Sequence, residues 1–179
     1  MLFNEMLRHT DFLTMSAHTM GVSTLDYNST GAVLNTTGLL FKMYGDHFFG
    51  SIPVAVSGNS PQPAFKTPLG GDQPTTSSGS PTYPLDIFAA ITPEHKYLNL
   101  AVVNALDSVQ NFELKVTGSR VNGASKLWQL TGDSVDAANH VGQPAAVEIK
   151  ETAIADVPQT VSVAPISVSV YRFPIAQAQ

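Results

Sequence analysis

The hydrophobic periodicity of this chain changes from helical to alternating near residue 50, and that change limits the folds open to it. Within residues 1–20 the apolar side chains recur at helical spacing and form an unusually wide face. Beyond residue 51 they alternate with polar side chains, as in strands of a half-buried sheet. We therefore predict a helical segment at residues 1–50 and a β domain at residues 51–179.

The first fifty residues are predicted to form a helix, a strand and a second helix. The first helix covers residues 1–20, the strand residues 22–27, and the second helix residues 37–48, where Asn35, Thr36 and Thr37 can cap it. This order is typical of the end of an α/β repeat. One strand cannot make a parallel sheet, so the segment is either an incomplete unit or an addition to something else.

The remaining residues are predicted to form a mainly β fold, a β-sandwich of jelly-roll type. A Pro- and Gly-rich stretch at residues 57–84 is long for a loop inside a compact domain. The predicted strands are residues 51–56, 85–91, 97–104, 111–117, 125–130, 146–151 and 160–173.

Composition excludes several classes of partner and site. The net charge is -5 and the few Lys and Arg residues are scattered, so no basic stripe is present to bind nucleic acid. No window approaches the roughly 20 apolar residues of a membrane span. The chain has no cysteine, which excludes disulfides and thiolate metal sites. Because the first helix lacks the pattern of a signal peptide, we expect a cytoplasmic protein, although secretion of a longer parent stays open.

No residue pattern marks an active site. The five histidines lack metal-ligand spacing, and no phosphate loop or other cofactor motif occurs, so we expect no metal and no cofactor. Most carboxylates lie where turns or helix caps favour them. Asp26, at the end of the predicted strand, is the carboxylate placed where a barrel enzyme carries functional groups, although such a residue more often accepts backbone hydrogen bonds.

A series of short motifs nevertheless runs through almost the whole chain in a fixed order. In that order they resemble the C-terminal part of α-L-arabinofuranosidases of glycoside hydrolase family 51. The motifs are residues 3–11, 19–21, 34–44, 46–48, 52–54, 58–63, Gly70-Gly-Asp-Gln-Pro74, 79–86, Leu100-Ala-Val-Val-Asn104, Leu130-Thr-Gly-Asp133, 138–139 and Ser167-Val-Ser-Val-Tyr171.

The resemblance implies a (β/α)8 barrel followed by a β-sandwich, in enzymes that release arabinofuranosyl groups from arabinan and arabinoxylan. The first fifty residues would then be the helix–strand–helix remnant that closes the barrel, with residues 22–27 as strand eight. Both catalytic glutamates of the family would precede Met1, so this chain would hold no catalytic residue. Asn35 and Asp26 are the positions that could face a sugar.

Two classes of function remain open. The favoured one is a non-catalytic structural or oligomerisation module, because its apolar helices would expose surfaces made for absent barrel elements. The chain would then form a homo-oligomer or bind the missing barrel part. The alternative is a glycosidase, active in a complex or through a new site, or a carbohydrate-binding sandwich for arabinose-containing polysaccharide. The predicted interface residues are Phe3, Met6, Leu7, Phe12, Leu13, Leu39, Leu40, Phe41 and Met43.

Overall fold

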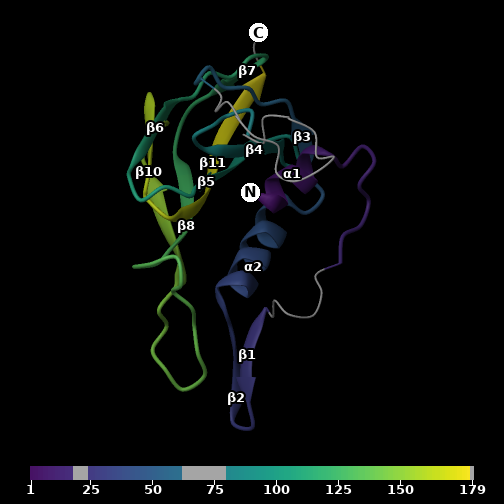
Figure 1. Ribbon diagram of the computed structural model, residues 1–179. Helices are drawn as coiled ribbons and strands as arrows, with labels where there is room; N and C mark the ends of the chain where they lie inside the picture. The colour runs from purple at the N-terminus through teal and green to yellow at the C-terminus, as the bar shows by residue number, and fades with distance from the viewer. Residues whose placement is uncertain (18–23, 62–79, 178–179) are drawn as a thin grey trace, which may run out of the picture.

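A computed structural model describes residues 1–17, 24–61 and 80–177, and the chain is mainly β (Figure 1). Two short helices precede most of the strands. The elements in chain order are α1 (Leu2–Arg8), β1 (Leu25–Asn28), β2 (Gly31–Leu34), α2 (Thr36–Phe48), β3 (Ile52–Val54), β4 (Asp86–Ile91), β5 (Tyr97–Asn104), β6 (Gln110–Glu113), β7 (Ser119–Val121), β8 (Ser125–Thr131), β9 (Glu148–Ile154), β10 (Thr160–Val163) and β11 (Ser167–Gln177).

One large antiparallel sheet organises the molecule. Its strands follow the order β3-β4-β5-β11-β8-β9, and β7 pairs with the end of β11. The last strand, β11, lies at the centre, with Val170 opposite Ala101 of β5 and Trp128 of β8. Pro53 sits in the edge strand β3, where a missing backbone N–H costs no ladder hydrogen bond.

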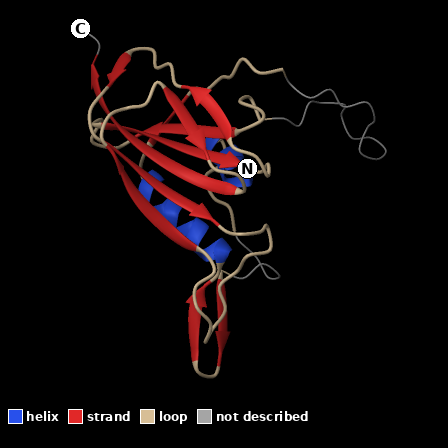
Figure 2. Ribbon diagram, turned by 90° about the vertical axis from the view of Figure 1, so that its left-hand side faces the viewer, coloured by secondary structure: helices blue, strands red, loops and turns tan. Residues whose placement is uncertain are grey.

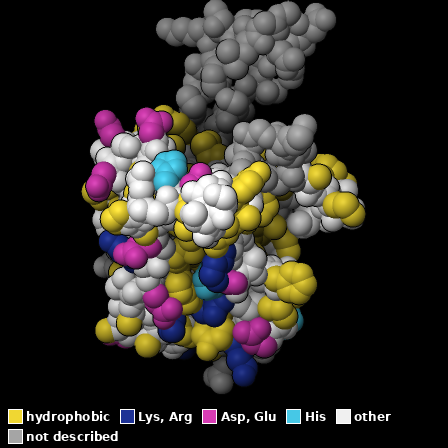
Figure 3. All heavy atoms as spheres, turned by 90° about the horizontal axis from the view of Figure 1, so that it is seen from below, with side chains coloured by type: hydrophobic (Ala, Val, Ile, Leu, Met, Phe, Trp, Pro, Cys, Tyr) yellow, Lys and Arg dark blue, Asp and Glu magenta, His cyan; other side chains and the backbone are white. Residues whose placement is uncertain are grey.

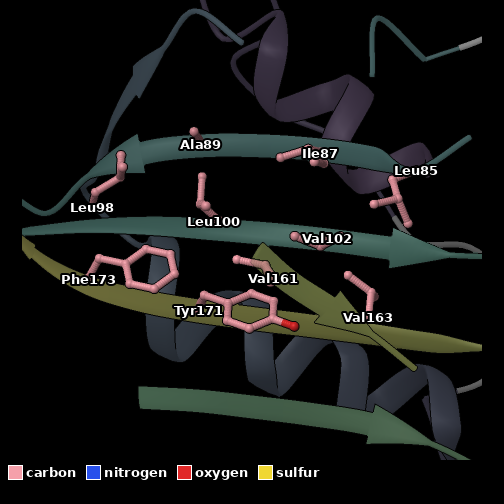
Figure 4. Packing of buried hydrophobic residues seen from close by; sticks show 10 residues of the cluster. All are labelled: Leu85, Ile87, Ala89, Leu98, Leu100, Val102, Val161, Val163, Tyr171 and Phe173. Atoms are coloured by element: carbon pink, nitrogen blue, oxygen red, sulfur yellow. The ribbon is translucent and has the colours of Figure 1, made fainter. Parts of the chain in front are cut away.

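A second layer, the two-stranded sheet of β6 and β10, packs on one face of the large sheet. Successive side chains of a strand point to opposite faces of the sheet, so every second residue of β4 faces this second layer. Ile87 and Ala89 of β4 point to this face, whereas Phe88 and Ala90 point to the other. Figure 4 shows the resulting cluster, to which β10 contributes Val161 and Val163. These packed antiparallel sheets confirm the predicted mainly β, sandwich-like class.

The two helices lie against the opposite face of the large sheet (Figure 2). Met43 is fully buried, and the Phe48 ring lies 5.3 Å from the Phe88 ring of β4. Residues on both sides of Gly50 therefore share one apolar cluster. The division into domains at residues 1–50 and 51–179 stays a prediction.

The first helix is much shorter than the predicted helix over residues 1–20. It ends at Arg8, and turns follow through Phe12. His9, Thr10 and Asp11 explain the end, because their side chains lose conformational freedom in a helix or compete for backbone hydrogen bonds. Residues 18–20 lie outside the described residues.

The predicted single strand at residues 22–27 is also corrected. Its described part belongs to an antiparallel hairpin of β1 and β2, with Leu25 opposite Leu34. In Figure 1 this hairpin extends beyond the N-terminal end of α2, away from the large sheet. Thr30 closes the turn by donating its backbone N–H to Asn28 Oδ1 at 2.8 Å. The segment is therefore helix, hairpin and helix, and β1 has no parallel neighbour among the described strands.

Several strand boundaries also differ from the sequence prediction: residues 51–56 shorten to β3, residues 146–151 shift to β9, and β7 was not predicted. The strand predicted at residues 111–117 ends at Glu113, and the one predicted at residues 160–173 is two strands, β10 and β11, separated by a turn at Ile166 with a positive φ of 44°. In the part of the chain that the structure describes, no helix is long and apolar enough to cross a membrane.

Candidate functional site

Asn35 and Asp26, the predicted substrate-binding residues, lie near the junction of the hairpin with α2. Asn35 caps the helix, and its Oδ1 accepts the backbone N–H of Gly38 at 3.0 Å. Asp26 lies on β1, where its Oδ2 accepts the backbone N–H of Val141 at 2.8 Å. His140 approaches the same oxygen at 3.8 Å. Both side chains thus hold backbone in place, and their contact with a sugar stays a prediction.

Asn139 ties the loop that follows β8 to this junction. It is buried, and it donates to the carbonyl oxygens of Leu34 (3.2 Å) and Val147 (2.8 Å). Its Oδ1 accepts the backbone N–H groups of Ala146 and Val147 at 2.9 Å each. One side chain therefore satisfies four backbone groups, which accounts for a buried amide here. Residue spacing alone could not show this role.

A buried polar cluster joins α1 to the large sheet. The Nδ2 of Asn4 donates to the Asp86 carbonyl oxygen at 3.0 Å, and Tyr44 donates its hydroxyl to Asn4 Oδ1 at 2.6 Å. Asp86 is almost fully buried and pairs with Arg8. Burial raises the pKa of the Tyr44 hydroxyl, so it stays a hydrogen-bond donor. These contacts fasten α1 to the large sheet.

A second polar cluster, which we call the Trp128 cluster, lies at the end of α2. Its members are Trp128, His47, Arg172, Tyr97 and Glu151. The His47 and Trp128 ring centroids lie 4.0 Å apart, and the Arg172 guanidinium lies 5.2 Å from the Trp128 centroid and 5.5 Å from that of Tyr97. Trp128 donates its indole N–H to Glu151 Oε2 at 2.9 Å. Cation–π contacts of this kind hold the rings against one another.

Charge and burial set the protonation states in the Trp128 cluster. Burial, and then the nearby Arg172, lower the pKa of His47 to about 4. The hydrogen bond from Lys126, and then that from Trp128, lower the pKa of Glu151. The cluster therefore holds a neutral imidazole and a carboxylate near pH 7. Figure 3 shows His, Lys or Arg, and Asp or Glu side chains side by side near the middle of the underside of the molecule.

An open groove of about 1190 Å³ lies between the two layers, and we call it the inter-sheet groove. Apolar side chains of β4 and β5 form one wall, residues 110–117 form another, and residues 54–60 also line the groove. Among its described lining residues, Glu113 is the single carboxylate. A glycosidase needs two carboxyl groups about 5 to 10 Å apart across the site, so this lining does not supply the pair.

Among the described residues, no group of three His, Asp or Glu side chains is placed to hold a metal ion.

The nine predicted interface residues are distributed between surface and core. Phe12 is 70% exposed and Phe41 is 36% exposed. Phe3, Leu7, Leu39 and Leu40 pack at the edge of the cluster beneath the helices, and Met6 and Leu13 are partly buried. Met43 has no exposed surface, so its place in the predicted interface is wrong: it faces the sheet because α2 turns this line of residues inward.

Several solved structures similar to this chain are arabinofuranosidases. An arabinose-bound family 51 α-L-arabinofuranosidase matches with a TM-score of 0.65 at 17% identity, over 97% of this chain and 26% of that chain. The family 51 arabinofuranosidase of Xanthomonas axonopodis pv. citri matches with a TM-score of 0.61 at 19% identity, over 84% and 28%. The α-L-arabinofuranosidase of Thermotoga maritima, as an arabinose complex, matches with a TM-score of 0.58 at 19% identity, over 85% and 31%.

These matches show the fold and its extent. No protein-family model matches the sequence, and no curated protein matches it significantly. The chain spans between 26% and 31% of the length of the three enzymes. The resemblance to family 51 arabinofuranosidases is therefore confirmed at the level of the fold, for one segment of such an enzyme.

Proposed function

We propose that these residues form a non-catalytic structural module of an arabinofuranosidase-type glycoside hydrolase, which acts on arabinan or arabinoxylan through a catalytic part outside residues 1–179. The fold relation supports the type of enzyme, since three arabinofuranosidases match over 84% to 97% of this chain. The polar contacts of the carboxylates support the structural role.

The proposal rests mainly on the partners that the carboxylates already have within the chain. Asp86 is buried against Arg8, Asp26 accepts a backbone N–H, and Glu151 accepts hydrogen bonds from Lys126 and Trp128. Each of these three carboxylates therefore already has a partner within the chain. A glycosidase site needs two carboxyl groups that face each other across a shared space. The described lining of the inter-sheet groove holds one carboxylate, Glu113, and so does not supply this pair.

The Trp128 cluster favours the second candidate, a carbohydrate-binding sandwich, because aromatic rings beside charged groups are suited to sugars. However, Trp128 already stacks on His47 and holds Arg172, so its ring serves contacts within the chain. We therefore rank carbohydrate binding below the structural role.

The test is turnover of p-nitrophenyl α-L-arabinofuranoside by the pure chain, beside retention on insoluble arabinan and xylan. We expect neither turnover nor retention. Turnover lost in the Asp26→Asn, Asp46→Asn or Asp86→Asn variant would establish catalysis by this chain and overturn the proposal. Retention lost in the Trp128→Ala variant, with no turnover, would support the binding module instead.

We also propose that the exposed apolar residues of the N-terminal segment bind the catalytic part or, in the isolated chain, a second copy. Leu2, Phe12 and Met15 are 67%, 70% and 84% exposed, and exposed apolar surface favours association. Light scattering at micromolar concentration should give a mass above one chain, and the Phe12→Ser variant should lower it. The exposed Val135→Ser change, in the loop after β8, is the matched control. A monomeric parent chain would contradict the proposal.

A further inference from the structure

The sequence contains the Asn-X-Ser/Thr pattern, which accepts N-linked glycans, at two places. They are Asn28-Ser-Thr30 and Asn35-Thr-Thr37, and no proline lies inside either triplet. A pattern this short also arises by chance, so residue type alone does not separate an acceptor from a coincidence. The local structure does, because a transferase must reach the asparagine amide from solvent.

Asn28 lies at the turn of the β1–β2 hairpin, where residues 27–32 are all exposed. Figures 1 and 2 both show this hairpin projecting away from the large sheet. Asn28 Oδ1 accepts the backbone N–H of Thr30 at 2.8 Å and the Thr30 hydroxyl at 2.6 Å. Among the described residues, no acceptor holds Asn28 Nδ2. The nitrogen that would receive a sugar is therefore left to solvent, beside the hydroxyl group that the pattern requires.

The second triplet is engaged within the fold. Asn35 is partly buried, and its Oδ1 caps α2 by accepting the backbone N–H of Gly38 at 3.0 Å. Thr36 donates its hydroxyl to the carbonyl oxygen of Ala137 at 2.7 Å, and Thr37 lies in the first turn of α2. A glycan on Asn35 would need the helix to lose this cap. The fold therefore closes one copy of the pattern and presents the other.

From this contrast we propose that Asn28 is an acceptor for an N-linked glycan, whereas Asn35 is not modified in the folded chain. The donor is a sugar chain joined to a lipid through a diphosphate, and an oligosaccharyl transferase supplies the catalytic groups. A bond forms between Asn28 Nδ2 and the anomeric carbon of the sugar. The bond from that carbon to the diphosphate oxygen breaks, and the lipid diphosphate leaves with the electron pair. Nδ2 passes one proton to a base of the transferase.

The modification has two consequences for the parent protein. Acceptors of this type are characteristic of surface loops in secreted proteins, so the proposal favours secretion of the longer parent over the cytoplasmic location expected from the sequence. A bulky, hydrophilic glycan at the turn would also cover the surface next to Tyr27, which is 75% exposed.

The test treats the folded full chain with a lipid-linked oligosaccharide and a purified oligosaccharyl transferase that requires only the Asn-X-Ser/Thr pattern. Two peptides, residues 24–32 and 31–39, present the same triplets without the fold, and mass spectrometry measures the occupancy of each asparagine. Both peptides should be modified. In the folded chain Asn35 reaches the transferase only when the helix end opens, so occupancy at Asn28 should be about tenfold or more above that at Asn35.

Matched variants separate the acceptor from general effects. Thr30→Ala removes the hydroxyl and should abolish modification of Asn28, whereas Thr30→Ser keeps a hydroxyl and should preserve it. Thr37→Ala removes the second pattern and should leave occupancy at Asn28 unchanged.

Four results would overturn the proposal. They are an unmodified Asn28 in the folded chain, equal occupancy of both asparagines there, and modification of Asn28 that persists in Thr30→Ala. The fourth is a peptide 31–39 that the transferase does not accept, since sequence alone would then explain the contrast.

Discussion

At the scale of single residues, His47 is the group whose charge most directly couples to folding. It stacks on Trp128 and lies 3.4 Å from Arg172, and Asp46, Lys42 and Glu151 complete its charged surroundings. Residue spacing could not predict this cluster, because its members come from α2, β5, β8, β9 and β11. Only the register of the sheet brings them together.

The depressed pKa of His47 predicts acid sensitivity. The unfolded chain binds a proton at this site near pH 6.5, whereas the folded chain does so only at about 4. The free energy of unfolding should therefore be highest above pH 6.5 and decrease as pH falls to about 4, where the contribution of this group levels off. Urea unfolding of the parent chain and the His47→Gln variant over this range measures it. Parallel curves for the two proteins would contradict the assignment.

At the scale of elements, the helix α2 was predictable and its surroundings were not. The Asn35 cap and the helical spacing after it gave a start within one residue of Thr36. The hairpin was not predicted because β2 covers only Gly31–Leu34, which is too short to show an alternation of apolar and polar residues. The strand at residues 111–117 alternates as predicted, but alternation reports which side is buried and cannot report whether a pairing strand is present.

Replacing Gly38 or Gly45 of α2 by alanine should change the stability of the fold in opposite directions. A Cβ at Gly38 would lie 2.1 Å from the Thr24 carbonyl oxygen, so Gly38→Ala must push the hairpin from the helix and should destabilise the fold by about 1–3 kcal/mol. A Cβ at Gly45 meets nothing within 4 Å, so Gly45→Ala should stabilise by up to about 1 kcal/mol. Thermal unfolding compares them. Equal shifts in Tm would contradict the close approach of Thr24 to the helix.

At the scale of the whole molecule, the chain joins a helical segment and a β layer around one large sheet. The order of motifs along the sequence was enough to indicate family 51 arabinofuranosidases, and the fold agrees with three such structures. The candidate site was only partly predictable. Asp26 and Asn35 were identified from their positions at element ends, and both turn out to hold backbone groups. The inter-sheet groove depends on which strands lack partners, which sequence periodicity does not record.

The central claim is that these residues support an arabinofuranosidase-type enzyme without carrying its chemistry. The most direct measurement is the rate of p-nitrophenol release from p-nitrophenyl α-L-arabinofuranoside at saturating substrate, with the purified chain and its Asp86→Asn variant compared to buffer. We predict the buffer rate for both proteins. A rate above buffer for the parent chain that is lost in a carboxylate variant would contradict the account.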